Sequence, residues 1–222
     1  MLKPRGIGCV LLVGLLLIAQ PSEAQPTFQA FSGMASALSG DITVTLPAHD
    51  TNDILLLLGW IRSVTETVTV NGWTAVSGTP FDSATERYWL FWKRATSAAE
   101  TNPLFDTDGT TANVFAAVVT YRKAITTGDP WEVTGAVATG TTDPASCTGI
   151  TTLTANALVV VPLGYGDNNN AAIATTGTDP STYVEHYVEA TTGDDGAVTF
   201  SEQARTTAGA TGTVSVDFDV AV

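Results

Sequence analysis

The chain carries ILLLL at residues 54–58 and LVVV at residues 158–161, two uninterrupted blocks of large apolar side chains. Blocks of this length are typical of strands that are covered on both faces, as in the middle of a β-sandwich. The segment VSVDFDV at residues 214–220 instead alternates apolar and polar residues, which is typical of a strand with one face in water. Two antiparallel sheets packed face to face accommodate both kinds of strand. We therefore predict an all-β fold, an antiparallel two-sheet β-sandwich of the jelly-roll type.

The rest of the chain favours strands and turns, with no long segment of helical period after residue 24. Thr is very common, Val and aromatic residues occur in the apolar blocks, and Gly, Asn, Asp and Pro lie between them. The pair Asn71-Gly72 is the strongest turn signal and predicts a hairpin, because both central residues of a type I′ turn need positive φ. The predicted strands cover residues 42–46, 54–60, 67–70 with 73–76, 87–94, 114–122, 149–153, 158–164, 183–190, 197–203 and 212–220.

Residues 1–24 have the three parts of a secretory signal peptide. A basic start is followed by eleven almost wholly apolar residues (9–19) and by the small-x-small triplet SEA at residues 22–24. The apolar stretch is shorter than the ~20 residues that a transmembrane helix needs. We therefore predict an N-terminal signal helix that is cleaved after Ala24. The remainder, residues 25–222, is predicted to be a single β-sandwich domain that is secreted, extracellular or periplasmic, with no stable membrane span. A retained N-terminal membrane anchor is the alternative interpretation.

The chain is strongly acidic, with 22 Asp and Glu residues against 9 Lys and Arg and a formal net charge of −13. Removal of Lys3, Arg5 and Glu23 with the signal peptide makes the charge one unit more negative. This charge excludes nucleic acid as a partner, because duplex binding depends on Lys and Arg that neutralise phosphates. Cys147 is the one cysteine left after cleavage, so the mature chain has no internal disulfide. We expect Cys147 to pack as a small apolar side chain.

No motif for nucleophilic catalysis, phosphate binding or a His/Cys metal site occurs in the chain. His49 and His186 are the only histidines, and neither lies in a pattern that places a base beside a nucleophile. We therefore predict no catalytic residue and no cofactor. Glycan hydrolysis is the remaining enzymatic option, because it needs only two acids held ~5 to ~10 Å apart. The candidate acids are Glu66, Glu86, Glu100, Asp129, Glu132, Glu185, Glu189 and Glu202.

Calcium is the one ion that the loops favour, because it takes carboxylate and carbonyl oxygens from flexible segments. The candidate ligands are Asp106 and Asp108 in one loop and Asp194 and Asp195 in another, and DNNN at residues 167–170 is a third cluster. None of these clusters has the spacing of an EF-hand loop. Asp and Asn also form ordinary turns without any metal, and this alternative stays open.

Tryptophan side chains are the candidate ligand-binding residues. In the segment YWLFWK at residues 88–93, alternation places Trp89 on one face of the predicted strand and Trp92 on the other. One face must pack into the core, and the other face is then a candidate platform for sugar rings. Trp73 and Trp131 complete the predicted set of carbohydrate-binding residues. The alternative is that most of these rings fill the core.

Segments spread along the chain carry a resemblance to a known group of proteins. These segments are GDITVTLP at 40–47, NDILL at 52–56, LFWKRAT at 90–96 with Asn102-Pro103, GDPWEVT at 128–134, LVVV at 158–161 and AGATG at 208–212. In them the chain resembles β-sandwich proteins encoded by tailed phages and found in environmental viral sequences, and the likeness covers nearly all of residues 27–220. The resemblance implies a virion-associated or tail-associated structural protein with no catalytic residues. Because virion proteins assembled in the cytoplasm do not normally carry a secretory signal, the signal peptide favours a cellular, exported relative, with the virion surface as the alternative location.

We therefore predict a non-enzymatic extracellular or virion-associated protein, structural or adhesive, that acts through surface contacts. Its expected partners are other copies of the chain, a virion or a cell surface, reached through sheet edges such as the predicted strand at residues 212–220. The second hypothesis is a carbohydrate-binding module that uses exposed tryptophans, and the third is a glycan hydrolase. A shift of tryptophan fluorescence on addition of polysaccharide separates the first two hypotheses.

Overall fold

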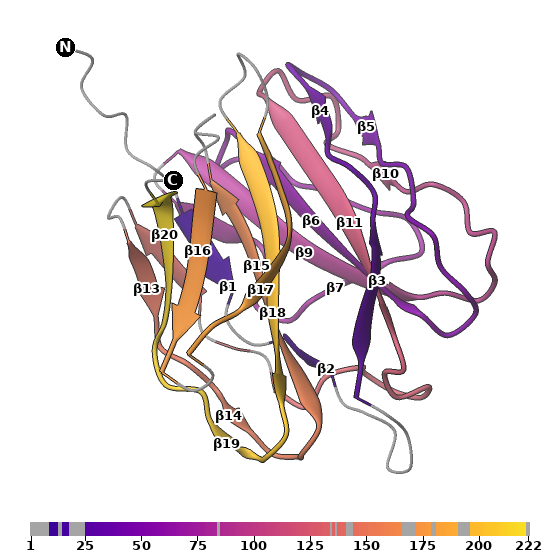
Figure 1. The fold of residues 1–222 in the computed structure, drawn as a ribbon. Helices are drawn as coiled ribbons and strands as arrows, with labels where there is room; N and C mark the ends of the chain where they lie inside the picture. The colour runs from indigo at the N-terminus through magenta and orange to yellow at the C-terminus, as the bar shows by residue number, and fades with distance from the viewer. Residues whose placement is uncertain are drawn as a thin grey trace.

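The structure is a computed structural model, and it consists of antiparallel β-sheets (Figure 1). It describes residues 9–12, 15–17, 25–83, 85–133, 135, 137–140, 144–165, 172–178, 181–190 and 196–220. The described part of the chain contains no helix, and hence none that is long and apolar enough to cross a membrane. The prediction of an all-β fold is confirmed.

Sheet I has the strand order β12-β1-β15-β18-β17, with β2 beside β15. Its longest pairing joins β15 to β18 in antiparallel register over the full length of both strands. The strands are β1 (Cys9–Leu12), β2 (Leu15–Leu17), β12 (Val137–Gly140), β15 (Ala157–Tyr165), β17 (Val184–Ala190) and β18 (Ala197–Arg205).

Sheet II has the strand order β3-β11-β6-β9-β7, with β4 beside β11 and β8 beside β9. Its centre is β6, which pairs along its whole length with β11 on one side and β9 on the other. The strands are β3 (Thr27–Phe31), β4 (Ala35–Ala37), β6 (Ile54–Ile61), β7 (Thr74–Ala75), β8 (Phe81–Ser83), β9 (Glu86–Arg94) and β11 (Val114–Arg122).

A smaller sheet and two short strand pairs flank the central sheets. Sheet III has the order β13-β20-β16, with β13 at Ala145–Cys147, β16 at Ala172–Gly177 and β20 at Val214–Val220. The prediction that residues 212–220 form a sheet edge is wrong, because β20 pairs with β13 on one side and with β16 on the other. The two short pairs are β5 (Ile42–Thr43) with β10 (Leu104–Phe105) and β14 (Thr151–Thr152) with β19 (Gly209–Ala210).

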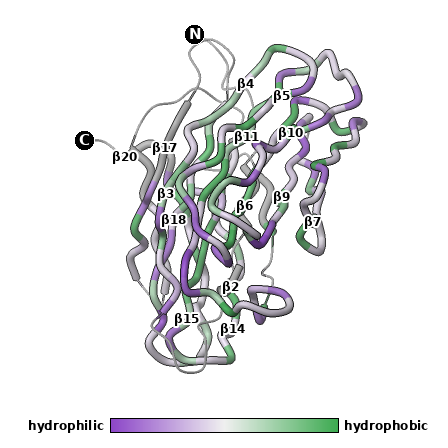
Figure 2. The backbone as a smooth tube through the Cα atoms, turned by 90° about the vertical axis from the view of Figure 1, so that its right-hand side faces the viewer, coloured by the Kyte–Doolittle hydropathy of each residue, from purple (hydrophilic) through white to green (hydrophobic). Residues whose placement is uncertain are grey.

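One apolar cluster fills the space between sheets I and II. Leu56 of β6 and Val119 of β11 pack in the same cluster as Val160 of β15 and Phe200 of β18, and all four side chains are buried. Apolar stretches follow the central strands of the sheets (Figure 2). Burial of one such side chain contributes about 1.5–3 kcal/mol relative to exposure, so this cluster is a main source of stability.

The outer faces of the two central sheets are covered as well. Every residue of β6 is buried, and outside sheet II Leu57 packs in one cluster with Val70 and Phe105. Outside sheet I, Val161 packs in one cluster with Val216 of sheet III. Figure 1 shows the resulting layers, with β5 and β10 beyond sheet II and sheet III beyond sheet I. The prediction that the two solid apolar blocks are covered on both faces is confirmed.

Most predicted strands coincide with observed ones. The predicted strand at residues 114–122 matches β11 at both ends. Six further predicted strands begin and end within two residues of observed ones. They are residues 54–60 (β6), 87–94 (β9), 158–164 (β15), 183–190 (β17), 197–203 (β18) and 212–220 (β20).

The Asn71-Gly72 turn is present, but the predicted type I′ hairpin is wrong. The N–H of Trp73 donates to the carbonyl of Val70 at 3.0 Å, which closes a turn. Gly72 has a φ of 76°, whereas Asn71 is not among the residues with positive φ. The flanking segments pair elsewhere, because Thr69 bridges to the residue after β10 and β7 pairs with β9. Long-range pairing thus outweighs the local turn preference.

The structure does not confirm the predicted signal helix. Where the N-terminal segment is described, it forms the strands β1 and β2. β1 lies between β12 and β15 and pairs antiparallel with both, and β2 pairs with β15 at Leu158–Val160. These two strands cover the edge of β15 that faces away from β18.

Candidate functional site

A surface depression of about 300 Å³ lies where the loop before β6 meets the end of β11. All of its lining residues except Ala124 are polar or charged, and concave sites with converging polar groups are the default candidates for ligand binding. The lining residues are Asp50, Thr51, Asn52, Asp53, Arg122, Lys123, Ala124 and Thr126.

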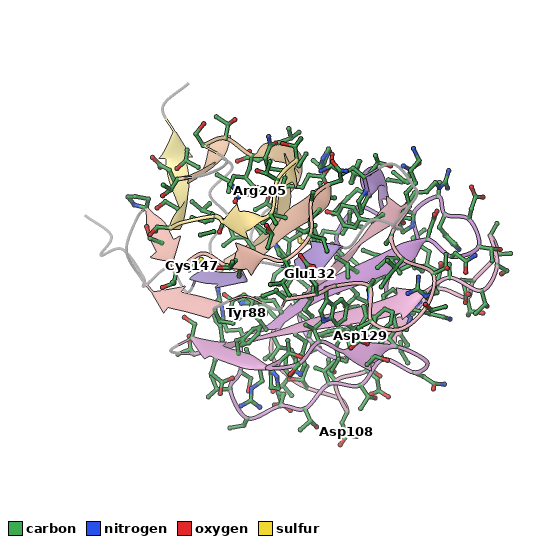
Figure 3. All side chains as sticks on the ribbon, turned by 90° about the horizontal axis from the view of Figure 1, so that it is seen from below. Tyr88, Asp108, Asp129, Glu132, Cys147 and Arg205 are labelled. Carbon is green, nitrogen blue, oxygen red and sulfur yellow. The ribbon has the colours of Figure 1, made fainter. Side chains whose placement is uncertain are left out.

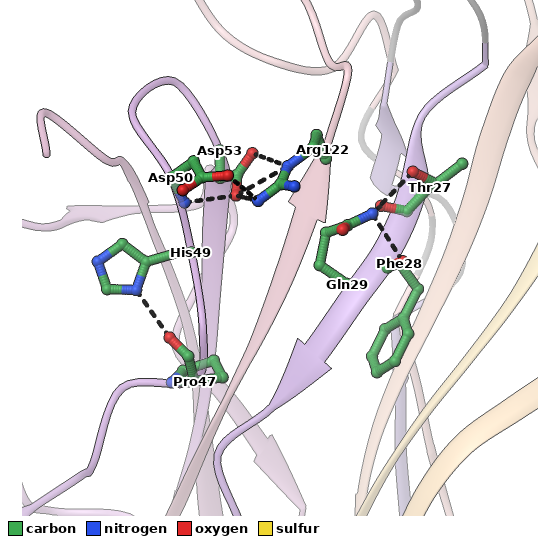
Figure 4. A network of polar contacts seen from close by, with 8 residues as sticks. All are labelled: Thr27, Phe28, Gln29, Pro47, His49, Asp50, Asp53 and Arg122. Carbon is green, nitrogen blue, oxygen red and sulfur yellow. Dashed lines mark hydrogen bonds and ion pairs between the residues drawn. The ribbon is translucent and has the colours of Figure 1, made fainter. Parts of the chain in front are cut away.

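A charged network forms one wall of this depression (Figure 4). Asp53, the residue before β6, is 2% exposed and accepts three hydrogen bonds from Arg122. Nε donates to Oδ1 at 3.0 Å and to Oδ2 at 3.3 Å, and Nη2 donates to Oδ2 at 2.8 Å. Asp50 contacts the same Nη2 through Oδ2 at 2.6 Å, and its backbone N–H donates to Asp53 Oδ2 at 2.8 Å. The hydrogen bonds to Asp53 raise the pKa of the Arg122 guanidinium. Asp53 is thus a buried carboxylate with a permanent cationic partner.

The backbone beside the network reverses direction at residues with positive φ. Asn52 has a φ of 73°, and its N–H donates to the carbonyl of Ala95 at 2.8 Å. Lys123 has a φ of 64° and is exposed. Near the same loop, His49 Nδ1 donates to the carbonyl of Pro47 at 2.7 Å, so Nδ1 carries the proton, because a carbonyl only accepts. The depression therefore contains hydrogen-bond donors and acceptors, together with positively and negatively charged side chains. Such a set suits a hydroxyl-rich or zwitterionic ligand.

A second group of ionisable side chains lies between sheets I and II. His186 Nε2 of β17 lies 2.8 Å from Glu202 Oε1 of β18. The imidazole stacks on Phe28 of β3, with ring centroids 3.9 Å apart and an interplanar angle of 7°. Burial, followed by the negative charge of Glu202, raises the pKa of the Tyr121 hydroxyl well above its ordinary value. Tyr121 stays neutral, and the group connects β3 and β11 of sheet II to β17 and β18 of sheet I.

Glu86 of β9 is a buried acid among aromatic rings. Its carboxylate is 4% exposed and accepts a hydrogen bond from the Tyr88 hydroxyl at 2.7 Å. Burial raises the pKa of Glu86, and the hydrogen bond from the Tyr88 hydroxyl offsets part of that rise. Trp60, Tyr88 and Phe115 form one buried cluster around this part of the structure. The Glu86 side chain is thus enclosed by other side chains of the chain, of which Tyr88 is labelled in Figure 3.

Three other candidate acids for glycan hydrolysis also make bonds within the chain, namely Glu100, Glu132 and Glu185. Glu100 pairs with Lys93 and accepts bonds from Thr96. Glu132 accepts two backbone N–H groups in the turn before β15, and Glu185 accepts the N–H of a residue in β16. These bonds account for the positions of the three carboxylates, and the side chain of Glu189 lies outside the described part of the structure.

The structure brings Trp92 and Trp131 together and leaves the other two predicted rings apart from them. Trp92 and Trp131 meet edge to face, with centroids 5.0 Å apart and an interplanar angle of 78°, and both pack on the cluster between sheets I and II. Trp89 is 4% exposed and lies edge-on to Phe105, while Trp73 packs on the cluster outside sheet II. The four rings do not share a plane or a face, so they form no common platform for a sugar.

The candidate calcium ligands that the structure describes lie in a turn. Asp106 Oδ1 accepts the backbone N–H of Asp108 at 3.0 Å, and Asp108 has a φ of 54° and is exposed. Among the described residues, no three His, Cys, Asp or Glu side chains are placed to hold a metal ion. Asp194 and Asp195 lie outside the described residues.

Comparisons with known proteins give no relative. No family model, no curated protein and no solved structure matches the chain. The likeness to β-sandwich proteins of tailed phages therefore stays a prediction that rests on the segments named above. We infer function from the geometry of this chain alone.

Proposed function

We propose that this chain is an exported, non-enzymatic structural or adhesive protein that acts through contacts at its surface. One observation carries the proposal. The central strands of sheets I and II are covered on both faces by other parts of the chain, so strand edges, loops and the outer face of sheet III are the surfaces left for contact. The structural bonds of buried acids such as Asp53 and Glu86 support the same interpretation.

The proposal includes export by removal of residues 1–24 as a signal peptide and a jelly-roll-like arrangement of the mature sandwich. An end strand favours contact of this kind. β17 is the last strand of sheet I, and its Val184 is 54% exposed. Unpaired N–H and C=O groups along such a strand are a template for another chain.

The test is the mass of the exported chain in solution. The full chain is expressed with its own leader in an exporting host, and the N-terminus of the product is read by mass spectrometry. Light scattering after size-exclusion chromatography, with and without calcium, should then show a defined assembly larger than one chain. A product that is monomeric in both conditions and that binds no cell or particle surface would contradict the proposal.

Glycan binding is a second candidate function, and the polar depression beside β6 favours it. Lys123 is exposed on its rim, whereas Asp108 lies in a distant loop. On a glycan array, the Lys123→Ala variant should lose at least about tenfold in affinity for any glycan that this depression binds, while Asp108→Ala should bind as the parent does. Equal binding by both variants would exclude this depression as the glycan site.

A further inference from the structure

The two edges of β15 are paired unequally. Along one edge, all nine residues of the strand pair with β18. Along the other edge, β2 pairs with Leu158–Val160 and β1 with Leu163–Tyr165. The break between these two pairings falls at Pro162, which has no N–H to donate. Pro in a sheet is confined to edge strands, strand starts and bulges, which fits the break in pairing along this second edge.

The strands that cover this second edge belong to the segment with the composition of a signal peptide. Removal of residues 1–24 removes β1 and β2 together. The exported chain then presents the second edge of β15 without its partners, although the described side chains of this strand are buried on both faces. A flat, apolar strand with a free edge pairs readily with another strand.

We propose that in the exported chain the free edge of β15 pairs with the same edge of a second copy, residues 157–161 against residues 157–161, about a two-fold axis. This inference rests on the proposed export and surface contact. A strand that pairs antiparallel with its own copy uses the same residues on both sides of the contact. A two-fold contact of this kind gives a closed dimer and no larger assembly. The observed partners β1 and β2 also run antiparallel to β15, so the edge already accepts that direction.

Contacts at both ends limit the pairing to this half of β15. At the start of the strand, Gln25 Nε2 donates to the carbonyl of Ala157 at 2.7 Å. Past Pro162, β12 is the next strand beyond β1. β12 is four residues long and is separated by β1 alone from residues 163–165 of β15. It could therefore close on that half of the strand, but it would leave Leu158–Val160 open. A second copy of the chain supplies the same apolar strand that this half lacks.

Cysteine cross-linking tests the pairing directly. In the exported chain with Cys147→Ser, single variants Leu158→Cys, Val159→Cys, Val160→Cys and Val161→Cys are oxidised and run on a denaturing gel. Directly opposed residues of an antiparallel pair have Cα atoms about 4.5–5.5 Å apart, which is within the reach of a disulfide. We expect a covalent dimer at the position nearest the axis and little at its neighbours. Thr199→Cys is the matched control, because β18 is paired on both sides there, and it should stay monomeric.

A second measurement tests the same pairing without any cysteine variant. A peptide with the sequence of residues 9–17, with Ser for Cys9 and lysines added at its ends, should lower the dimer fraction of the exported chain. The uncleaved chain purified from cytosol should be monomeric, because β1 and β2 occupy the edge.

The outcomes separate this inference from the proposed function. An assembly that forms no cross-link at any of the four positions and resists the peptide would overturn the β15 pairing and leave surface contact through another edge in place. A monomeric exported chain whose β15 amides are protected from hydrogen exchange would overturn the pairing in favour of closure by β12. Retention of residues 1–24 in the exported product would overturn it as well.

Discussion

Asp53 and Arg122 lie 69 residues apart in the chain and join the start of β6 to the end of β11 through three hydrogen bonds. Removal of the guanidinium leaves the buried Asp53 carboxylate with the backbone N–H of Asp50 as its remaining partner. An uncompensated buried charge is costly, so Arg122→Ala should lower the free energy of unfolding by about 3 kcal/mol. Urea denaturation measures this change. The neighbouring exposed Lys123→Ala should change it by less than about 0.5 kcal/mol, and similar losses in both variants would contradict the prediction.

Because Gly59 has no side chain, the Phe105 ring can pack against the outer face of β6 at this position. A Cβ at position 59 would lie 2.0 Å from Phe105 Cε2, which neither side can accommodate without moving. Gly59→Ala should therefore destabilise the protein by about 1–3 kcal/mol through overpacking. In a double-mutant cycle, Phe105→Leu should relieve part of that loss.

Gly72→Ala is the control for the Gly59 cycle. Gly72 has a positive φ but open space around it, so its loss of stability comes from the backbone and should be the same with Phe105 or Leu at position 105. If the stability losses of Gly59→Ala and Phe105→Leu were additive in the double variant, the clash at position 59 would be relieved by movement of other residues.

Glu100 should make the protein lose stability in acid. Its hydrogen bond with Lys93, helped by Thr96, lowers the pKa of Glu100 to about 2 from the ordinary 4.5. Because the folded-state pKa is lowered, the stabilisation is fully present above about pH 4.5 and is lost as the pH falls towards 2. Glu100→Gln should therefore be less stable than the parent at pH 7, and the gap should close between pH 4.5 and 2. Unfolding by guanidinium across this range is the measurement, and a constant gap would refute the assignment.

Glu86 should have the opposite pH dependence. Burial raises its pKa above 4.5 in the folded chain, so the protonated form is favoured by folding. This contribution is fully present below pH 4.5 and is lost as the pH rises through the folded-state pKa. Glu86→Gln keeps an acceptor for the Tyr88 hydroxyl and carries no charge. Its stability relative to the parent should therefore increase as the pH rises from 4.5, and a relative stability that falls over this range would show that Glu86 is stabilising as the anion.

The central strands were predictable because their apolar runs are long and unbroken. β11 matches its prediction at both ends, and β6 differs by one residue. β3 and β16 were not predicted, since TFQAF is short and half-buried and AIATTG has one large apolar residue, Ile173, among small residues and Thr. Their place in the sheets depends on pairing with β11 and β20, which no local pattern contains.

The candidate sites were harder to predict than the strands. Alternation correctly separated Trp89 from Trp92, but it carried no information that Phe105 lies over the outer face where Trp89 sits. The ion pair of Asp53 with Arg122 was also missed. A local signal existed, because each residue is a charged group directly at the end of a solid apolar strand, where a partner from a neighbouring strand is expected.

The division of the sheets along the chain has a consequence for biosynthesis. Sheet II comes wholly from residues 27–122, whereas all of sheets I and III except β1 and β2 comes from residues 137–220. The first half leaves the ribosome or the export channel with the apolar face of Leu56 and Val119 uncovered. At about 5–20 residues per second, Val160 and Phe200 follow only several seconds later. During that interval the nascent chain is a half-sandwich whose largest apolar face is open to other nascent chains, and a chaperone that holds residues 54–122 would act at that stage.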